Sequence, residues 1–172
     1  MPNWCQNNLE ITGPKDQLEN FRAVAHDKCQ CYKDGAKQTS VLSFHAIRPV
    51  PKELLKRQYG GENLGNTIAK IDGCMNGYNW EGKYWGCKWG ACRVDLDFID
   101  GECLCYAFET AWAPPLALIT YASEHWPDLV FEIGYEELGM NFAGKAVLKA
   151  GKIVKEKEWE PEPDYDDKED DE

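Results

Sequence analysis

Two alternating segments on either side of Asp100-Gly101 constrain the fold of this chain most strongly. Segments 92–98 and 103–109 both alternate between apolar and polar side chains, which is the period of a half-buried strand. An Asp-Gly pair between such runs is a strong hairpin signal. We therefore predict an antiparallel hairpin that buries Leu104, Tyr106 and Phe108 on one face and carries Cys103 and Cys105 on the other.

The remaining elements follow from hydrophobic period and from proline and glycine breaks. We predict strands at 6–12, 41–47, 129–135, 142–148 and 153–159, and helices at 14–25, 52–57 and 114–122, with a loop at 27–39. This order predicts an α+β fold: a ferredoxin-like antiparallel sheet with helices packed on one face, an irregular insertion at about 50–80 and an extra C-terminal hairpin. The expected domain is 1–159.

The net charge of −11 is concentrated at the C-terminus. Eleven acidic residues and two lysines between Glu156 and Glu172 contribute −9, so the rest of the chain carries only −2. Such a segment cannot bury enough apolar surface to order itself, and we expect a disordered acidic tail at 160–172. It is a solubilising tail, a lure for a basic partner or an imitation of a nucleic-acid backbone, the last two through Asp164, Asp166, Asp167, Glu169, Asp170 and Asp171.

The eight cysteines are expected to be free thiols, without metal or other cofactor. The first residues show no secretion signal and no stretch is long enough to span a membrane, so we expect a cytoplasmic protein of a bacterial host with no membrane partner. Cys29 and Cys31, like Cys103 and Cys105, form C-x-C pairs rather than the C-x-x-C pairs of structural zinc sites.

A Trp-rich run contains the first candidate binding residues, Trp85, Lys88 and Trp89. Exposed indole faces stack on nucleic-acid bases while a nearby lysine meets phosphate. The alternative is a packed aromatic knot, with the Lys88 stem lying over an indole. The near-neutral body has no obvious basic stripe, which favours the packed knot.

A second aromatic run ends in Trp112-Ala113-Pro114-Pro115, where proline starts a helix. We expect Trp112 to plug the core there, in one buried cluster with Trp85 and Trp89. Glu109 and Glu137 are candidate acid–base or binding carboxylates, but nothing in their spacing shows that they meet, so capping or a salt link across a hairpin is favoured. The histidines are scattered and no Cys–His signature or nucleotide-binding motif occurs, so no catalytic residue is assigned.

Five blocks of the sequence resemble the YubB-like family of phages, plasmids and bacterial genomes: 1–7 (MPNWCQN), 77–80 (GYNW), 85–89 (WGCKW), 108–115 (FETAWAPP) and 135–144 (YEELGMNFAG). The resemblance implies a ferredoxin-like domain and a mobile-element context, and no assigned activity. The family run is closer to W-G-T-K-W-D, so Cys87 and Gly90 depart from it.

Three functions are therefore compared. The first is a non-enzymatic interaction protein of a phage or plasmid-like element, in its most specific version an inhibitor of a host defence or nucleic-acid-handling protein with a basic surface. The second is a single-stranded nucleic-acid-binding protein that uses the Trp/Lys face. The third and weakest is an enzyme acting on nucleotides. A negative face favours the first function and a positive face the second.

Overall fold

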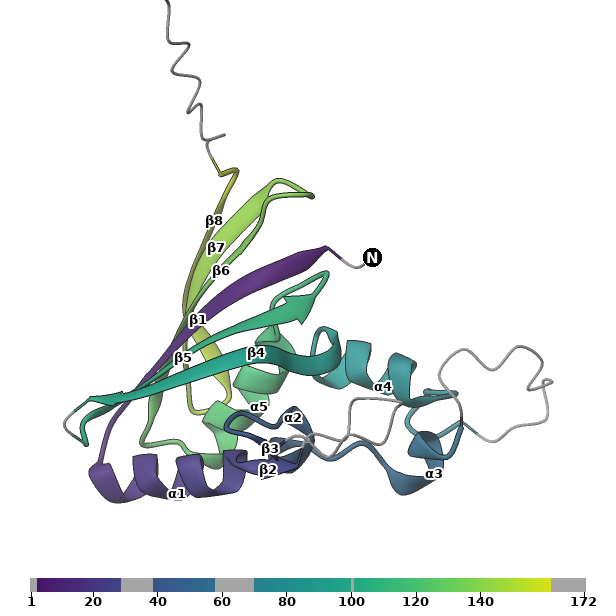
Figure 1. Cartoon of the computed structure of the whole chain (residues 1–172), viewed down its shortest axis with the longest axis horizontal. Coiled ribbons are helices and arrows are strands. Elements are labelled where there is room, and N and C mark those ends of the chain that lie inside the picture. The colour runs from purple at the N-terminus through teal and green to yellow at the C-terminus, as the bar shows by residue number, and fades with distance from the viewer. Residues whose placement is uncertain (1–2, 29–38, 58–69, 100, 162–172) are drawn as a thin grey trace, which may run out of the picture.

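The fold is organised around one six-stranded antiparallel sheet. The computed structural model describes residues 3–28, 39–57, 70–99 and 101–161. The strands run in the spatial order β4-β5-β1-β6-β7-β8, and every neighbouring pair is antiparallel (Figure 1). Their bounds are β1 Trp4–Thr12, β4 Lys88–Ile99, β5 Cys103–Ala111, β6 Val130–Glu137, β7 Phe142–Lys149 and β8 Lys152–Trp159.

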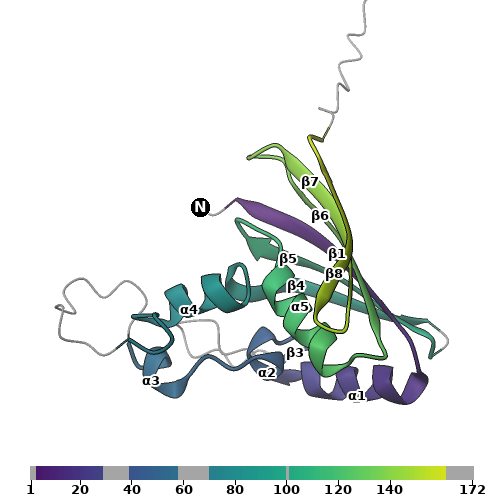
Figure 2. The ribbon, with the colours of Figure 1, turned by 180° about the vertical axis from the view of Figure 1, so that it is seen from behind.

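Strands β4, β5, β1 and β6 with two helices form the ferredoxin-like unit. Helix α1 (Lys15–Ala25) follows β1, and helix α5 (Leu116–His125) follows β5, so the chain order is β-α-β-β-α-β. Both helices lie on the same side of the sheet (Figure 2). The hairpin β7–β8 extends the sheet beyond β6. The predicted α+β class, the helices on one face and the extra C-terminal hairpin are confirmed.

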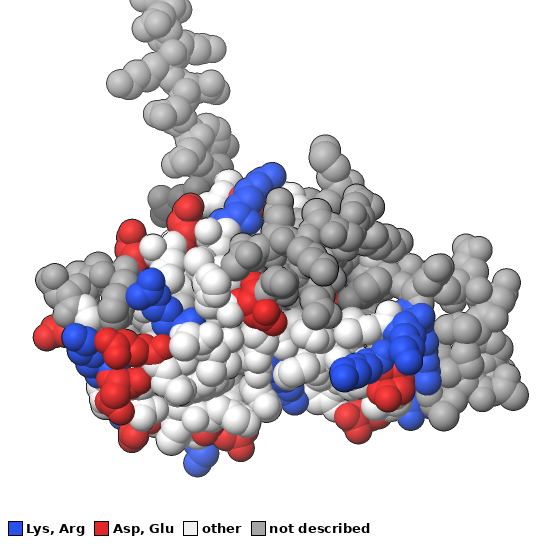
Figure 3. Space-filling view, turned by 60° about the horizontal axis from the view of Figure 1, so that its bottom comes forward, with Lys and Arg blue, Asp and Glu red and all other residues white. Residues whose placement is uncertain are grey.

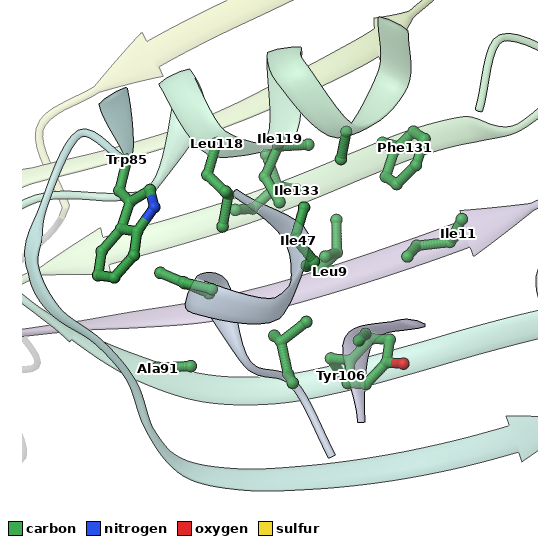
Figure 4. Close-up of a cluster of buried hydrophobic side chains, with 14 of the residues drawn as sticks. Leu9, Ile11, Ile47, Trp85, Ala91, Tyr106, Leu118, Ile119, Phe131 and Ile133 are labelled. Carbon is green, nitrogen blue, oxygen red and sulfur yellow. The ribbon is translucent and has the colours of Figure 1, made fainter. Parts of the chain in front are cut away.

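The core fills the space between the sheet and the helices. The inward positions of β1 and β5 include Leu9, Ile11 and Tyr106, and helix α1 adds Phe21, all at most 1% exposed. Figure 4 shows these strand residues facing the α5 residues Leu118 and Ile119, together with Trp85 from the turn before β4. The period-2 alternation of the strands therefore produces one buried face, as predicted.

The region before β4 differs most from the predicted elements. The predicted strand at 41–47 is wrong, because Phe44–Ile47 forms the short helix α2. The Ser43 side chain caps this helix by accepting a hydrogen bond from the Ala46 N–H (3.2 Å). The predicted loop at 27–39 begins and ends with a small strand pair, β2 (Asp27–Lys28) and β3 (Thr39–Ser40).

The insertion at about 50–80 contains more helix than its glycines indicated. Helix α3 (Lys52–Leu55) confirms the short helix predicted there, and helix α4 (Gly77–Tyr84) was not predicted. Asn76 starts α4 by accepting a hydrogen bond from the Asn79 N–H (3.0 Å). Residues 58–69 of the insertion and 162–172 of the tail lie outside the described residues. Within the described ranges, no helix has the length and apolar character to cross a membrane.

Candidate functional site

The two Trp-rich runs meet at the start of helix α5. The Trp85 carbonyl accepts a hydrogen bond from the Leu118 N–H (3.3 Å), and Gly86 adopts a positive φ of 89° beside the Pro114 carbonyl. A Cβ at Gly86 would approach that carbonyl oxygen to 3.1 Å. These blocks of sequence therefore join the turn before β4 to the turn after β5.

The three candidate tryptophans lie in different environments. Trp85 is 1% exposed and packs edge-to-face on Phe44 and Trp80, as a core residue does. Trp89 is half-buried. Trp112 is 42% exposed and has a φ of 73°, so the prediction that it plugs the core is wrong. Its side chain leaves the sheet because the chain turns sharply at the end of β5, where the Trp112 N–H donates to the Asn3 carbonyl (2.9 Å).

Lys88 and Trp89 both contact Tyr78 of helix α4. The Trp89 Nε1–H donates to the Tyr78 hydroxyl (3.1 Å), and its backbone N–H donates to the buried Glu81 carboxylate (3.1 Å). The Lys88 ammonium lies 5.4 Å from the centre of the Tyr78 ring. The predicted cation–π contact thus exists with a different ring. It leaves Trp89 engaged within the fold rather than presented as a stacking platform.

Polar residues of the sequence blocks form a buried hydrogen-bond network between β1 and β5. The Asn7 amide donates to the Thr110 hydroxyl (2.9 Å), which donates in turn to the Ala113 carbonyl (2.8 Å). Asn7 and Thr110 are at most 2% exposed. The network fixes the end of β5, and its members satisfy one another as buried polar groups require.

The two candidate carboxylates have separate structural partners. Glu109 on β5 binds the Arg93 guanidinium of β4 (2.7 Å), a salt link across the hairpin. Glu137 is buried and accepts hydrogen bonds from the N–H groups of Gly139 (2.8 Å) and Met140 (2.6 Å). These bonds hold the β6–β7 turn. These are the two structural roles that the sequence suggested for the pair, a salt link across a hairpin and a capping role.

Two of the buried thiols, those of Cys5 and Cys87, are poor nucleophiles. Burial raises the pKa of the Cys5 thiol to about 12 and raises that of Cys87 well above its ordinary value, with the neighbouring Glu81 carboxylate adding to the second shift. The thiolate is the reactive form of cysteine, so these groups stay protonated at neutral pH. Their environment suits small apolar core residues.

The side of the sheet opposite the helices carries a feature that the sequence did not reveal. A depression of about 390 Å³ lies over β1, β4, β5, β6 and β7. Small residues at its centre, Ala107 and Gly134, leave the hollow, and they flank Asn8 in the strand register. Its charged lining is four carboxylates and one lysine: Glu10, Asp95, Asp97, Glu132 and Lys145.

The depression is acidic even after its one ion pair is counted. The Lys145 ammonium binds the Glu132 carboxylate at 2.5 Å, which leaves Glu10, Asp95 and Asp97 in excess. All three occupy outward positions of the alternating strands. The sequence therefore shows these acidic residues as the polar positions of alternating strands. Only the order of the strands in the sheet brings them together.

The helical side has a different charge pattern. Figure 3 shows acidic and basic side chains interspersed there, with a basic group toward the α3 end. The exposed or half-buried basic residues of α3, α4 and their flanks are Lys52, Lys56, Arg57, Lys70 and Lys83. Two of them are engaged with backbone, because Arg57 donates to the Met75 carbonyl and Lys83 to the Asp72 carbonyl.

Comparisons with known proteins agree with this fold. Residues 88–172 match the family model described as a ferredoxin-like domain in Api92-like protein. The chain also resembles the crystal structure of a protein api92 from Yersinia pseudotuberculosis, with a TM-score of 0.60 and 12% identity over 95% of this chain and 100% of that one. At this identity the likeness shows a shared fold. None of the curated proteins matches the chain.

Proposed function

We propose that this chain is a non-enzymatic interaction protein that docks a basic partner on the open face of its sheet, which is the side opposite the helices. The observation that carries the proposal is the acidic depression on the side opposite the helices. Charge complementarity of this kind steers association and fixes the register of a complex. The occupant to which the proposal commits is a protein segment rich in arginine or lysine.

The shape of the depression supports a side chain with an apolar stem and a cationic head. Ala107 and Gly134 form a floor without long side chains, and carboxylates of β1 and β4 stand around it. An arginine or lysine lays its methylene groups on apolar surface while its charged end stays near polar groups. Asp95 and Asp97 are exposed and free to pair with such a head group.

Exposed apolar residues at one end of the same sheet support a protein partner. Trp112, Leu138 and Met140 are 42%, 69% and 58% exposed. Asn3 connects the strand ends that carry them, since its carbonyl binds Trp112 and its amide lies against Gly139. Tryptophan is among the residue types that are enriched at interface hot spots.

The polar residues and buried thiols of the sequence blocks have structural roles. Asn7, Thr110 and Glu137 use their polar atoms to hold strand ends and turns, and the thiols of Cys5 and Cys87 have raised pKa values. These roles account for the residues by fold stability alone.

In its more specific form, the proposal assigns the protein an origin and a class of partner. The resemblance to YubB-like proteins supports an origin in a phage or plasmid-like element, and the partner is then a host or element-encoded protein with a basic surface. Inhibition of a host defence or nucleic-acid-handling protein is the most specific form. The acidic composition of residues 160–172 adds to the attraction that such a surface would feel.

The test measures binding of a fluorescent, unstructured peptide rich in lysine and arginine. The face variant is Asp95→Asn/Asp97→Asn, and the matched control is Glu124→Gln/Asp128→Asn, which removes two exposed charges at and just beyond the end of α5. We expect the face variant to bind more weakly by up to about 30-fold, since it removes two exposed charges and each exposed charge pair contributes up to about 1 kcal/mol. Equal losses in both variants would reject a docking site on the open face.

A single-stranded nucleic-acid binder remains the second candidate, favoured by the basic residues of α3, α4 and their flanks. The same titration with a fluorescent single-stranded oligonucleotide tests it. Tight, salt-dependent oligonucleotide binding that falls in Lys52→Gln/Lys56→Gln and persists in Asp95→Asn/Asp97→Asn would favour this function over the first.

A further inference from the structure

A cluster of metal-binding donor atoms lies at the edge of the acidic depression. The Sγ atoms of Cys103 and Cys105 are 3.3 Å apart, and the carboxylate of Glu10 brings a third donor. The three ligand atoms all lie within 4.8 Å of one another. The two cysteines are half-buried and Glu10 is exposed, so the cluster is open to solvent on one side.

The strand register explains why these three residues meet. Cys103 and Cys105 are two residues apart on β5 and share its outward face. Glu10 on β1 is the direct cross-strand partner of Cys105. Asp97 on β4 is the partner of Cys105 on the other side and lines the same depression. Paired strands of the sheet therefore hold the donors, rather than a loop.

We infer that Glu10, Cys103 and Cys105 form an exchangeable binding site for a thiophilic divalent cation of the Zn²⁺ or Cd²⁺ class. Zn²⁺ accepts two thiolates and a carboxylate, and a site with three protein ligands keeps a fourth position for water or another ligand. Two sulfurs bound to Zn²⁺ at about 2.3 Å in tetrahedral geometry lie about 3.8 Å apart, so a small side-chain adjustment suffices. Thiolate ligands favour these cations over Mg²⁺ or Ca²⁺.

Binding exchanges protons for the cation. Each thiol loses its proton when its sulfur becomes a ligand, so one cation displaces two protons and forms two metal–sulfur bonds. The apparent affinity therefore increases with pH.

The inferred site is not a structural zinc site, and it is separate from the docking site proposed above. The C-x-C spacing argues against a structural zinc on which folding depends. The inferred site is instead open to solvent and lies on a sheet that is already held by its own hydrogen bonds. Loss of cation binding leaves the peptide test of the docking face unaffected, because that test is made without added metal and uses Asp95 and Asp97.

The experiment titrates the full chain, reduced and metal-free, with Cd²⁺ and follows the cadmium–thiolate charge-transfer absorbance. We expect one Cd²⁺ per chain, displaced by Zn²⁺ and not by Mg²⁺. Cys103→Ser and Cys105→Ser should each abolish the tight site. Glu10→Gln should weaken binding by at least about tenfold, since even indirect partners of a metal contribute that much. Asp95→Asn is the matched carboxylate control and should change affinity less than Glu10→Gln.

The second C-x-C pair supplies the decisive control. Cys29→Ser/Cys31→Ser should retain the cadmium site, and a site that persists in Cys103→Ser but disappears in this double variant would overturn the inference. Alkylation of the unmodified chain, read by mass spectrometry, checks the assignment without any variant. Zn²⁺ should protect Cys103 and Cys105 from alkylation. Equal labelling of both with and without Zn²⁺ would also overturn it.

Discussion

Single residues in the Trp-rich runs have different roles, and their substitution should separate them. Trp85→Ala should reduce the free energy of unfolding by about 3–5 kcal/mol, because it empties a buried aromatic cluster. Trp112→Ala removes a side chain that is 42% exposed and should cost less than about 1 kcal/mol. Denaturant unfolding of both variants measures the difference. Equal losses would contradict the assignment of Trp112 to the surface.

His45 makes the stability of the fold depend on pH. Its Nδ1 accepts a hydrogen bond from the Val50 N–H (3.2 Å), which requires the neutral ring. Burial lowers the pKa of His45 from its ordinary value of 6.5, with Asp27 opposing the shift. The unfolded chain then binds more protons below that value, so stability falls as pH decreases through 6.5 toward the folded pKa.

The measurement compares His45→Asn with the unmodified chain by denaturant unfolding across this range of pH. The advantage of the unmodified chain in free energy of unfolding should shrink as pH falls. Losses that come from carboxylates are common to both proteins and cancel in the difference. A difference that stays constant from about pH 7.5 to about pH 5 would contradict the role of His45.

Gly86→Ala tests the junction between the turn before β4 and the start of α5, and Gly82→Ala serves as its control. Gly86 has a positive φ and faces the Pro114 carbonyl at the start of α5, so Gly86→Ala should destabilise the fold by about 1–2 kcal/mol or more. Gly82 lies within α4 with no atom near its missing Cβ, so Gly82→Ala should stabilise by about 0.5–1 kcal/mol. Thermal unfolding of both variants gives the sign of each change, and a neutral Gly86→Ala would reject the close junction.

Much of the sheet was predictable from the sequence because β1, β5 and β6 alternate with period 2, whereas β8 is exposed along its whole length. The inward residues Leu104, Tyr106 and Phe108 and the outward pair Cys103 and Cys105 follow directly from that period. The segment at 41–47 was not predictable in this way. Its β-branched and aromatic residues favour a strand, whereas the Ser43 cap and tertiary packing produce a short helix.

The candidate site was predictable only in part. Glu109 and Glu137 have the salt-link and turn-holding roles that local sequence suggested. The environment of Trp112 depends on a backbone reversal at the end of β5, which residue type does not encode. The acidic depression depends on strand order, because Glu10, Asp95 and Glu132 come from strands that are far apart in the chain.

On the scale of the whole molecule, acidic residues are in excess in two places, on the open face and in the C-terminal segment. Deleting 162–172 removes eight acidic residues and one lysine. We expect little change in the free energy of unfolding, and weaker binding of the basic peptide mainly at low salt, since exposed charges are screened over about 8 Å at physiological ionic strength. Peptide titrations of both chains at several salt concentrations test this. Unchanged affinity at every concentration would remove the segment from the binding account.

The location of the basic peptide on the folded domain tests the central claim most directly. Backbone amide NMR spectra of the chain lacking 162–172, recorded during peptide titration, report which residues are contacted. The account predicts shifts concentrated at the outward positions of the open face, namely Asn8, Glu10, Asp95, Asp97, Ala107 and Gly134. Saturable shifts confined to α1, α5 or the α3–α4 region, with the open face unchanged, would contradict it.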